Sequence, residues 1–216
     1  MKTIFQIVLW IICVGLGYLI YRSVTGPIEF QKVKEERFSK VISNLKDIRN
    51  SQEAYRAVNG KFANDFKSLV AFVDSGKYTI TQQRDSSYME FDKVYGIDLL
   101  RELTIIDTLG FVSVKDSLFK GDDRYKSMMN VPYAQGGETF TMKSEIIDKG
   151  GYKAPVFEAK VKKDIILYDQ PKDLLTRENA QISVEEVNGP EIRVGSLTDV
   201  STNGNWPPIY DKKGDQ

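Results

Sequence analysis

The sequence predicts an α+β protein in which an N-terminal transmembrane helix is followed by a long amphipathic helix packed on an antiparallel sheet. Three observations carry this prediction. Residues 3–21 contain no formal charge, residues 38–55 repeat apolar side chains at helical spacing, and residues 76–197 hold short β-type runs separated by turn residues. Thirty basic and thirty acidic side chains balance, so the chain lacks the positive excess typical of nucleic-acid-binding proteins.

Residues 1–24 are predicted to form a single-pass signal anchor, which makes the lipid bilayer the first expected partner. The uncharged run TIFQIVLWIICVGLGYLIY would reach about 28 Å as a helix, close to the hydrocarbon thickness of about 30 Å. A cleaved export signal is the alternative, but its apolar core is about 7 to 15 residues long and ends at a small-x-small site. This run instead ends in Tyr18-Leu-Ile-Tyr-Arg22.

Two rules disagree about the side of the membrane on which the remaining residues lie. Five Lys or Arg side chains follow the span closely and only Lys2 precedes it, which favours a cytoplasmic C-terminal part by the positive-inside rule. A very short N-terminus before a long apolar run is typical of an export-type anchor. We favour export, with the C-terminal domain outside the cytoplasm. Cys13, which lies inside the span, is the only cysteine of this sequence, so no intrachain disulfide can form.

Residues 25–75 are expected to hold the long amphipathic helix and a short second helix. Thr25-Gly26-Pro27 supplies a break and a helix start, and Asn59-Gly60 supplies a stop. One stripe runs along the first helix: Phe38, Val41, Leu45, Ile48, Gln52 and Tyr55. A second helix is predicted over residues 63–73, with Asn64 or Asp65 near its start and Asp74-Ser75-Gly76 at its end.

The stripe on the long helix has two interpretations. It could be a coiled-coil seam through which copies self-associate, or it could pack on a sheet of the same chain. We favour the second interpretation because the pattern lasts little more than two heptads.

Residues 76–197 predict an antiparallel sheet with one further helix. The expected strands cover residues 77–83, 87–94, 104–106, 110–114, 138–147, 156–161, 165–168 and 191–194. Asp148-Lys149-Gly150-Gly151 predicts a hairpin turn, and Pro171 predicts a helix over residues 172–187. Residues 198–216 are expected to be irregular, with Trp206 and Tyr210 as anchors onto the body.

The composition argues against catalysis, and we expect no enzyme activity, no cofactor and no metal. The chain contains no histidine and its single thiol is in the span, which removes Ser-His-Asp, Cys-His and His-metal sites. The acidic groups at Asp122-Asp123, at Glu185-Glu186 and between Asp211 and Asp215 are interpreted as solvated turns or helix faces. A calcium site would draw on Asp199, Asn203, Asn205 and Asp211, but their spacing matches no EF-hand.

The first 75 residues resemble type IV pilins and the pseudopilins of type II secretion. The resemblance rests on the following residues at the end of the long helix and in the turn after it: Gln52, Ala54, Tyr55, Asn59, Gly60, Phe62, Asp65, Phe66 and Leu69. It implies a pilin-like fold, a single-pass anchor in a bacterial inner membrane with the C-terminal domain in the periplasm, and assembly with other envelope proteins. The glycine-ended leader and the acidic residue that pilins carry in the apolar run are absent here. Residues 194–208 (VGSLTDVSTNGNWPP) also resemble membrane-anchored bacterial proteins of no assigned role.

These observations predict a non-enzymatic, membrane-anchored structural or scaffolding component of a bacterial envelope assembly, pilin-like or related to secretion. Its expected partners are other membrane or envelope proteins, or further copies bound through the long helix, and no nucleic acid. The alternative is a membrane-tethered extracytoplasmic domain that binds a small molecule, peptide or glycan on its sheet. The candidate contacts for that alternative are Tyr125, Tyr133 and Trp206.

Overall fold

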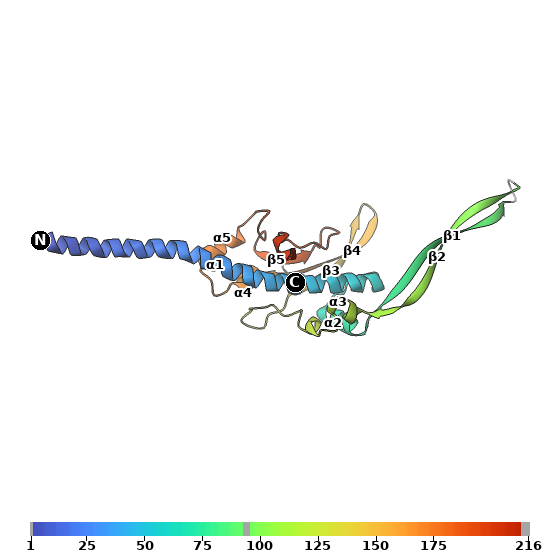
Figure 1. The fold of residues 1–216 in the computed structure, drawn as a ribbon, viewed down its shortest axis with the longest axis horizontal. Helices are drawn as coiled ribbons and strands as arrows, with labels where there is room; N and C mark the ends of the chain where they lie inside the picture. The colour runs from blue at the N-terminus through green and yellow to red at the C-terminus, as the bar shows by residue number, and fades with distance from the viewer. Residues whose placement is uncertain (1, 93–95, 213–216) are drawn as a thin grey trace. The chain divides into compact units, whose positions relative to one another are not determined.

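The computed structural model describes residues 2–92 and 96–212 of the chain. Two compact units divide it: unit 1 covers residues 1–50 and 127–216, and unit 2 covers residues 51–126 (Figure 1). The fold is α+β, with a long N-terminal helix and two antiparallel sheets, as the sequence predicts. The expected strands belong to two separate sheets rather than one.

The long helix α1 (Lys2–Asn59) is continuous, so the break expected at Thr25-Gly26-Pro27 is wrong. Pro27 lies inside the helix and removes one backbone hydrogen bond, a penalty of about 3 kcal/mol that the intact turns on both sides outweigh. The predicted stop is confirmed. Gly60 has φ 71°, and its N–H donates to the Arg56 carbonyl at 2.8 Å, as in a left-handed helix cap.

Unit 1 contains the three-stranded sheet, in the order β3 (Thr141–Lys149), β4 (Tyr152–Lys162) and β5 (Glu191–Gly195). Strands β3 and β4 join through Gly150 and Gly151, whose φ angles are 66° and 84°. Two positive φ angles define the tight hairpin turn whose twist matches that of the strands. The turn predicted there is confirmed.

The core of unit 1 combines apolar side chains of α1 with those of the three-stranded sheet and its connections. Phe38, Val41, Leu45 and Ile48 of the α1 stripe are all fully buried, so this part of the stripe packs inside the protein and offers no open coiled-coil seam. The sheet and its connections supply the facing apolar side chains: Val156, Ala159, Val161, Ile166, Leu167, Ile192 and Val194. Trp206 and Tyr210 are buried, as expected of anchors for the C-terminal residues.

Two predictions for the end of unit 1 are wrong. The strand expected at residues 165–168 is replaced by the short helix α4 (Lys163–Ile166), and the helix expected to reach residue 187 is α5 (Lys172–Asn179), which ends eight residues earlier. The physical reason is that Glu178 and Glu186 bind the same ammonium group, that of Lys34. A continuous helix would separate the two glutamates by about 12 Å along its axis.

A single turn of helix, α6 (Ile209–Lys212), lies in the C-terminal residues, which are otherwise irregular as predicted.

Unit 2 holds the end of α1, the helices α2 (Phe66–Ser75), α3 (Val114–Phe119) and η1 (Arg124–Lys126), and a two-stranded sheet. Helix α2 starts three residues later than predicted, with Asp65 as its N-cap, and residue 114 begins α3 instead of ending a strand. A small core is buried between the helices: Ala54, Phe62, Ala63, Leu69, Val73, Val114, Phe119 and Tyr125.

The two-stranded sheet pairs β1 (Lys77–Asp92) with β2 (Ile97–Ser113). Four short strands were predicted over this stretch, and the structure merges them into these two long ones. Residues 93 and 94, which were predicted to end one of the short strands, lie outside the described residues. We call the pair β1–β2 the hairpin.

Candidate functional site

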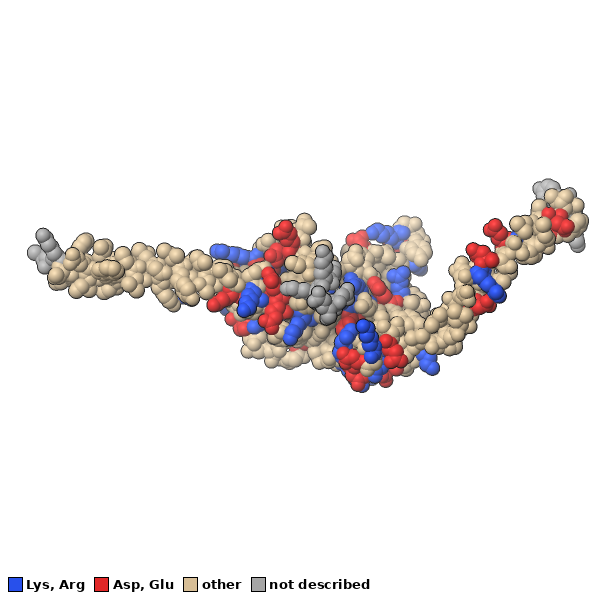
Figure 2. Space-filling model, viewed as in Figure 1, with Lys and Arg blue, Asp and Glu red and all other residues tan. Residues whose placement is uncertain are grey.

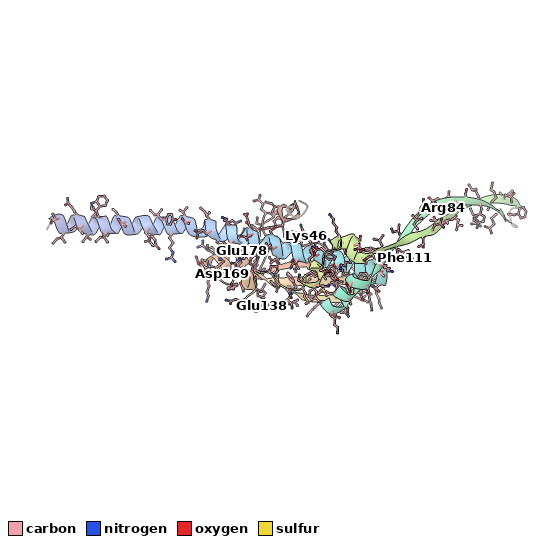
Figure 3. The ribbon with its side chains drawn as sticks, turned by 60° about the horizontal axis from the view of Figure 1, so that its bottom comes forward. Lys46, Arg84, Phe111, Glu138, Asp169 and Glu178 are labelled. Atoms are coloured by element: carbon pink, nitrogen blue, oxygen red, sulfur yellow. The ribbon has the colours of Figure 1, made fainter. Side chains whose placement is uncertain are left out.

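The hairpin is exposed along almost its whole length. Strand β1 has sixteen residues and β2 has seventeen, so the ladder is about 50 Å long at a rise of about 3.3 Å per residue. Every described residue from Thr79 to Phe91 is exposed, and β2 has no buried residue. Figure 3 shows side chains, including the labelled Arg84, projecting from this element.

Polar residues that looked like strand breaks in the sequence are paired across the ladder. Arg84 forms an ion pair with Asp107 (Nη2 to Oδ2, 3.2 Å), and the hydroxyl of Thr104 donates to Asp85 at 3.1 Å. Cross-strand pairs of this kind are the unit of sheet stabilisation. They explain why the ladder continues through the polar stretch QQRDSS (residues 82–87) and why four predicted strands became two.

One irregularity interrupts the ladder near its base. The pairing shifts between Ile80 and Thr81, where Leu109 is the additional residue on β2.

Beyond this bulge, residues alternate between two faces. One face carries the two ion pairs Arg84–Asp107 and Arg101–Glu90. The opposite face carries Asp85, Asp98 and Glu102 and no basic side chain in the described residues.

Large apolar side chains of the hairpin are exposed to solvent. Leu103 is 52% exposed, Leu100 61% and Ile106 64%. Eight further large apolar side chains are exposed on the same element: Ile80, Tyr88, Met89, Phe91, Ile97, Leu109, Phe111 and Val112. These side chains lie on both faces of the hairpin. An isolated two-stranded hairpin is at best marginally stable in water, and exposed apolar patches are typical of sites of association. This element has the properties of an interaction surface.

Unit 1 contains a group of paired charges, which we call the ion cluster: Lys34, Lys163 and Glu178, which are buried, and Glu186, whose side chain is 27% exposed. Lys163 is 0% exposed and donates to Glu178 Oε1 at 2.7 Å and to the Val187 carbonyl at 2.7 Å. Lys34 donates to Glu178 Oε2 at 3.0 Å and to Glu186 Oε2 at 2.8 Å. Burial lowers the pKa of Lys163, and the hydrogen bond that Lys163 donates to Glu178 opposes that shift. The two cations and two carboxylates balance, so the ion cluster fixes α5 and the following loop to α1.

A second polar contact joins α1 to the residues after α4. Arg37 forms a bidentate pair with Asp169, at 2.6 Å and 2.7 Å, and also donates to the Ile166 carbonyl at 2.8 Å. The hydrogen bonds from Arg37 lower the pKa of Asp169 to about 2. The labelled Asp169 and Glu178 in Figure 3 mark these two contacts. Both are structural, since every charge in them has an opposite partner.

A hollow of about 440 Å³ lies beside the ion cluster, lined by residues of α1 and the C-terminal part of unit 1. Its lining includes Glu35, Glu185, Pro207 and Tyr210. Burial and nearby glutamates raise the pKa of Tyr210, so its hydroxyl stays protonated at neutral pH. The lining residues include no Ser, Thr, Cys, Lys or His, so this hollow offers binding space without those common nucleophiles and bases.

The acidic groups singled out in the sequence do not converge on one point. Asp123 binds Lys115 at 2.7 Å and Lys126 at 3.3 Å, which lowers its pKa, and Asp122 accepts the Arg124 N–H at 3.2 Å. Asp199 pairs with Lys149, and the Asn205 side chain binds backbone groups. The Asp211 side chain and residues 213–216 lie outside the described residues. Among the described residues, no three His, Cys, Asp or Glu side chains are grouped to hold a metal ion.

The three aromatic candidates differ in exposure. Tyr125 is fully buried and its hydroxyl donates to Asp74 at 2.5 Å, and Trp206 is 8% exposed. Tyr133 is 36% exposed, but its ring lies against Arg37 and Lys40, with the cations 5.4 Å and 5.7 Å from its centroid. Two of the three therefore face the interior. The hairpin, which sequence reasoning did not single out, was detectable as the dense apolar run LLRELTII (residues 99–106).

The first part of α1 is long and apolar enough to cross a membrane, and no residue of its most apolar window is buried. Figure 2 shows the corresponding stretch without charged side chains up to the folded body. Length and composition therefore fit a membrane anchor. Compared with known protein families, curated proteins and solved structures, the chain matches none.

Proposed function

We propose that this chain is a non-enzymatic structural component of a bacterial envelope assembly, anchored in the inner membrane by the start of α1. Its folded part lies in the periplasm and joins other proteins through the hairpin. The observation that carries the proposal is the exposure of large apolar side chains along a two-stranded ladder of about 50 Å. Packing of α1 against the antiparallel sheet of unit 1 supports the pilin-like part of the proposal.

The described surface supports association better than chemistry. The buried charges of the ion cluster are mutually neutralised, and the hollow near Tyr210 is lined by no Ser, Thr, Cys or Lys side chain. The hairpin, by contrast, leaves two strand edges with unpaired backbone groups, which are ready templates for strand addition.

Deletion of the outer hairpin tests the assembly part of the proposal. Residues 81–109 are replaced by Asn-Gly, a sequence suited to a tight hairpin turn, so that the paired residues Ile80 and Gly110 flank the new turn. The full-length chain is expressed in a bacterial host with its native partners. Membranes are solubilised in mild detergent and the complexes are sized by native electrophoresis. We expect the wild-type chain in a complex larger than its monomer and the shortened chain at monomer size. Equal sizes for both chains would contradict the proposal.

A thiol-labelling experiment tests the side of the membrane. Ile182→Cys, at a position 90% exposed, is introduced into a Cys13→Ser background. We expect a membrane-impermeant thiol reagent to label cells whose outer membrane alone has been permeabilised. The parent Cys13→Ser chain is the control, and labelling only after lysis of the inner membrane would place the folded part in the cytoplasm.

A further inference from the structure

The two edges of the hairpin differ in their capacity to pair with another strand. The middle of β1, residues 82–87, contains only polar side chains, whereas β2 has Leu103, Ile105 and Ile106 at its centre. β-Branched and other apolar residues favour strand pairing, and exposed flat apolar edges are the ones that pair between molecules. The edge of β2 is therefore the better template.

The charge pattern of β2 is complementary to itself. In an antiparallel pair, residues directly opposite each other share a face, so two identical strands related by a two-fold axis must place one residue opposite itself. With Thr104 on the axis, Arg101 lies opposite Asp107 of the second copy, and the same contact occurs twice. Arg101 and Asp107 occupy the same face of the hairpin, as this pairing requires.

The same register brings the apolar centres together. Leu103 lies opposite Ile105 of the second copy, Glu102 lies opposite Ile106, and no like charges face each other between Asp98 and Gly110. If Leu103 or Ile105 lies on the axis instead, each residue faces a position two residues away from its partner in the Thr104 register. Both Arg101–Asp107 contacts are then lost. An axis at Arg101, Glu102 or Asp107 would place identical charges opposite each other, which is destabilising.

We propose that two copies of this chain pair antiparallel along β2, with the two-fold axis at Thr104, to form a four-stranded sheet in the order β1-β2-β2-β1. This inference rests on the proposed function, because it names the hairpin's partner. In the four-stranded sheet, Arg101 lies between Glu90 of its own chain, 3.1 Å away in the monomer, and Asp107 of the second copy. Anchoring in one bilayer raises the effective concentration of the copies for each other.

Cysteine crosslinking tests the axis. Thr104→Cys is placed in the full-length Cys13→Ser chain, and native membranes are treated with a mild oxidant. Opposed antiparallel residues have Cα atoms about 4.5 to 5.5 Å apart, within the range of about 4.4 to 6.8 Å that a disulfide spans. The matched control is Ser87→Cys, which lies mid-strand on β1. We expect Thr104→Cys to give about tenfold more disulfide-linked dimer than Ser87→Cys, because a disulfide cannot form beyond about 7 Å.

Two further variants fix the register and guard against loss of folding. Chains carrying Leu103→Cys and Ile105→Cys are co-expressed, and we expect the mixed dimer to exceed either self-linked dimer. Adding Leu103→Lys to Thr104→Cys places a charge at the apolar centre and is expected to reduce the dimer about tenfold. Leu103 is exposed, so the single chain keeps its fold, which circular dichroism of the purified protein checks.

The outcomes separate this inference from the proposed function. Dimer at position 104 and none at position 87 supports pairing along β2. Dimer at position 87 alone overturns it in favour of the β1 edge. Absence of dimer at both positions also overturns it; if the hairpin deletion still reduces the size of the complex, the partner is a different protein and the proposed function stands. If the deletion has no effect either, both proposals fail.

Discussion

The body of unit 1 and the hairpin of unit 2 both carry paired charges, but in opposite surroundings. In the body, the Lys163 side chain is 0% exposed and every ion of the cluster has fixed partners. On the hairpin, the Arg84 and Asp107 side chains are 63% and 48% exposed. Breaking a buried pair leaves an uncompensated charge, whereas an exposed pair contributes little. The first arrangement fixes a tertiary fold, and the second leaves charges free to form new contacts with a partner.

The largest expected effect comes from breaking the ion cluster. Glu178→Leu removes the carboxylate shared by Lys34 and Lys163 and should lower the free energy of unfolding by about 3 to 5 kcal/mol. Urea unfolding of the full-length chain in detergent micelles, followed by the fluorescence of Trp206 in a Trp10→Phe background, measures it. Glu90→Leu on the hairpin is the control and should change stability by at most about 0.5 kcal/mol. Similar losses for both variants would remove the contrast between the two regions.

A second substitution tests the helical part of unit 2, which lies next to the hairpin in the chain. Buried Gln52 accepts the Ala63 N–H at 2.9 Å and donates to the Ala63 carbonyl at 3.0 Å. Gln52→Ala leaves both backbone groups without these bonds and should cost about 2 to 6 kcal/mol, at about 1 to 3 kcal/mol for each unsatisfied group. Hydrogen exchange of residues 60–65 should accelerate in parallel. Gln31→Ala, which removes only an exposed bond to Glu35, should leave that exchange unchanged.

The pH dependence of stability tests the ion pair between Arg37 and Asp169, whose exposure lies between that of the ion cluster and that of the hairpin pairs. The pKa of Asp169 is about 2 in the folded chain because Arg37 donates to it, below its ordinary value of 3.8. A lowered folded-state pKa gives stability that is present above about pH 4 and is lost as the pH falls through 2. Since solvent reaches this carboxylate, the contribution should be about 0.5 to 1 kcal/mol.

Unfolding of the wild-type chain and the Arg37→Met variant between pH 5 and pH 2 measures this contribution. The stability difference between them should shrink as the pH falls. A difference that stays constant across this range would show that Arg37 stabilises by packing alone.

The smallest expected effect on folding lies on the hairpin. Arg84→Gln removes its exposed pair with Asp107 and should change the free energy of unfolding by at most about 0.5 kcal/mol. Thermal unfolding of the purified chain checks this. A loss above 2 kcal/mol would mean that the hairpin is stabilised from within and needs no partner.

The helices were largely predictable because their signals are local. The helical spacing of apolar residues on α1 predicted that Phe38 and Leu45 are in the core, and Asn59-Gly60 predicted the end of the helix. Gln52 is one of the residues on which the resemblance to pilins rests, and its side-chain amide forms hydrogen bonds with both backbone groups of Ala63. The turn at Gly150-Gly151 was readable because both residues need positive φ angles.

Long-range contacts account for two of the errors. The sequence of residues 180–187 predicts a helix, yet Glu186 lies close to Glu178 because both carboxylates bind Lys34. The local sequence pattern contains no signal for this contact. The charged stretch at Arg84 and Asp85 looked like a break between strands until β2 supplied Asp107 and Thr104 as partners. The hairpin was therefore missed as a candidate site, although its apolar residues were visible.

By itself, the sequence determined the apolar start of α1, the long helix with its buried stripe, the tight turns and the absence of histidine, because each depends on neighbouring residues or on composition alone. Only the tertiary structure decided the pairing of Lys34 and Lys163 with one glutamate and the joining of four short runs into one exposed hairpin. Both depend on residues far apart in the chain, whose contacts form only when the backbone has brought them together.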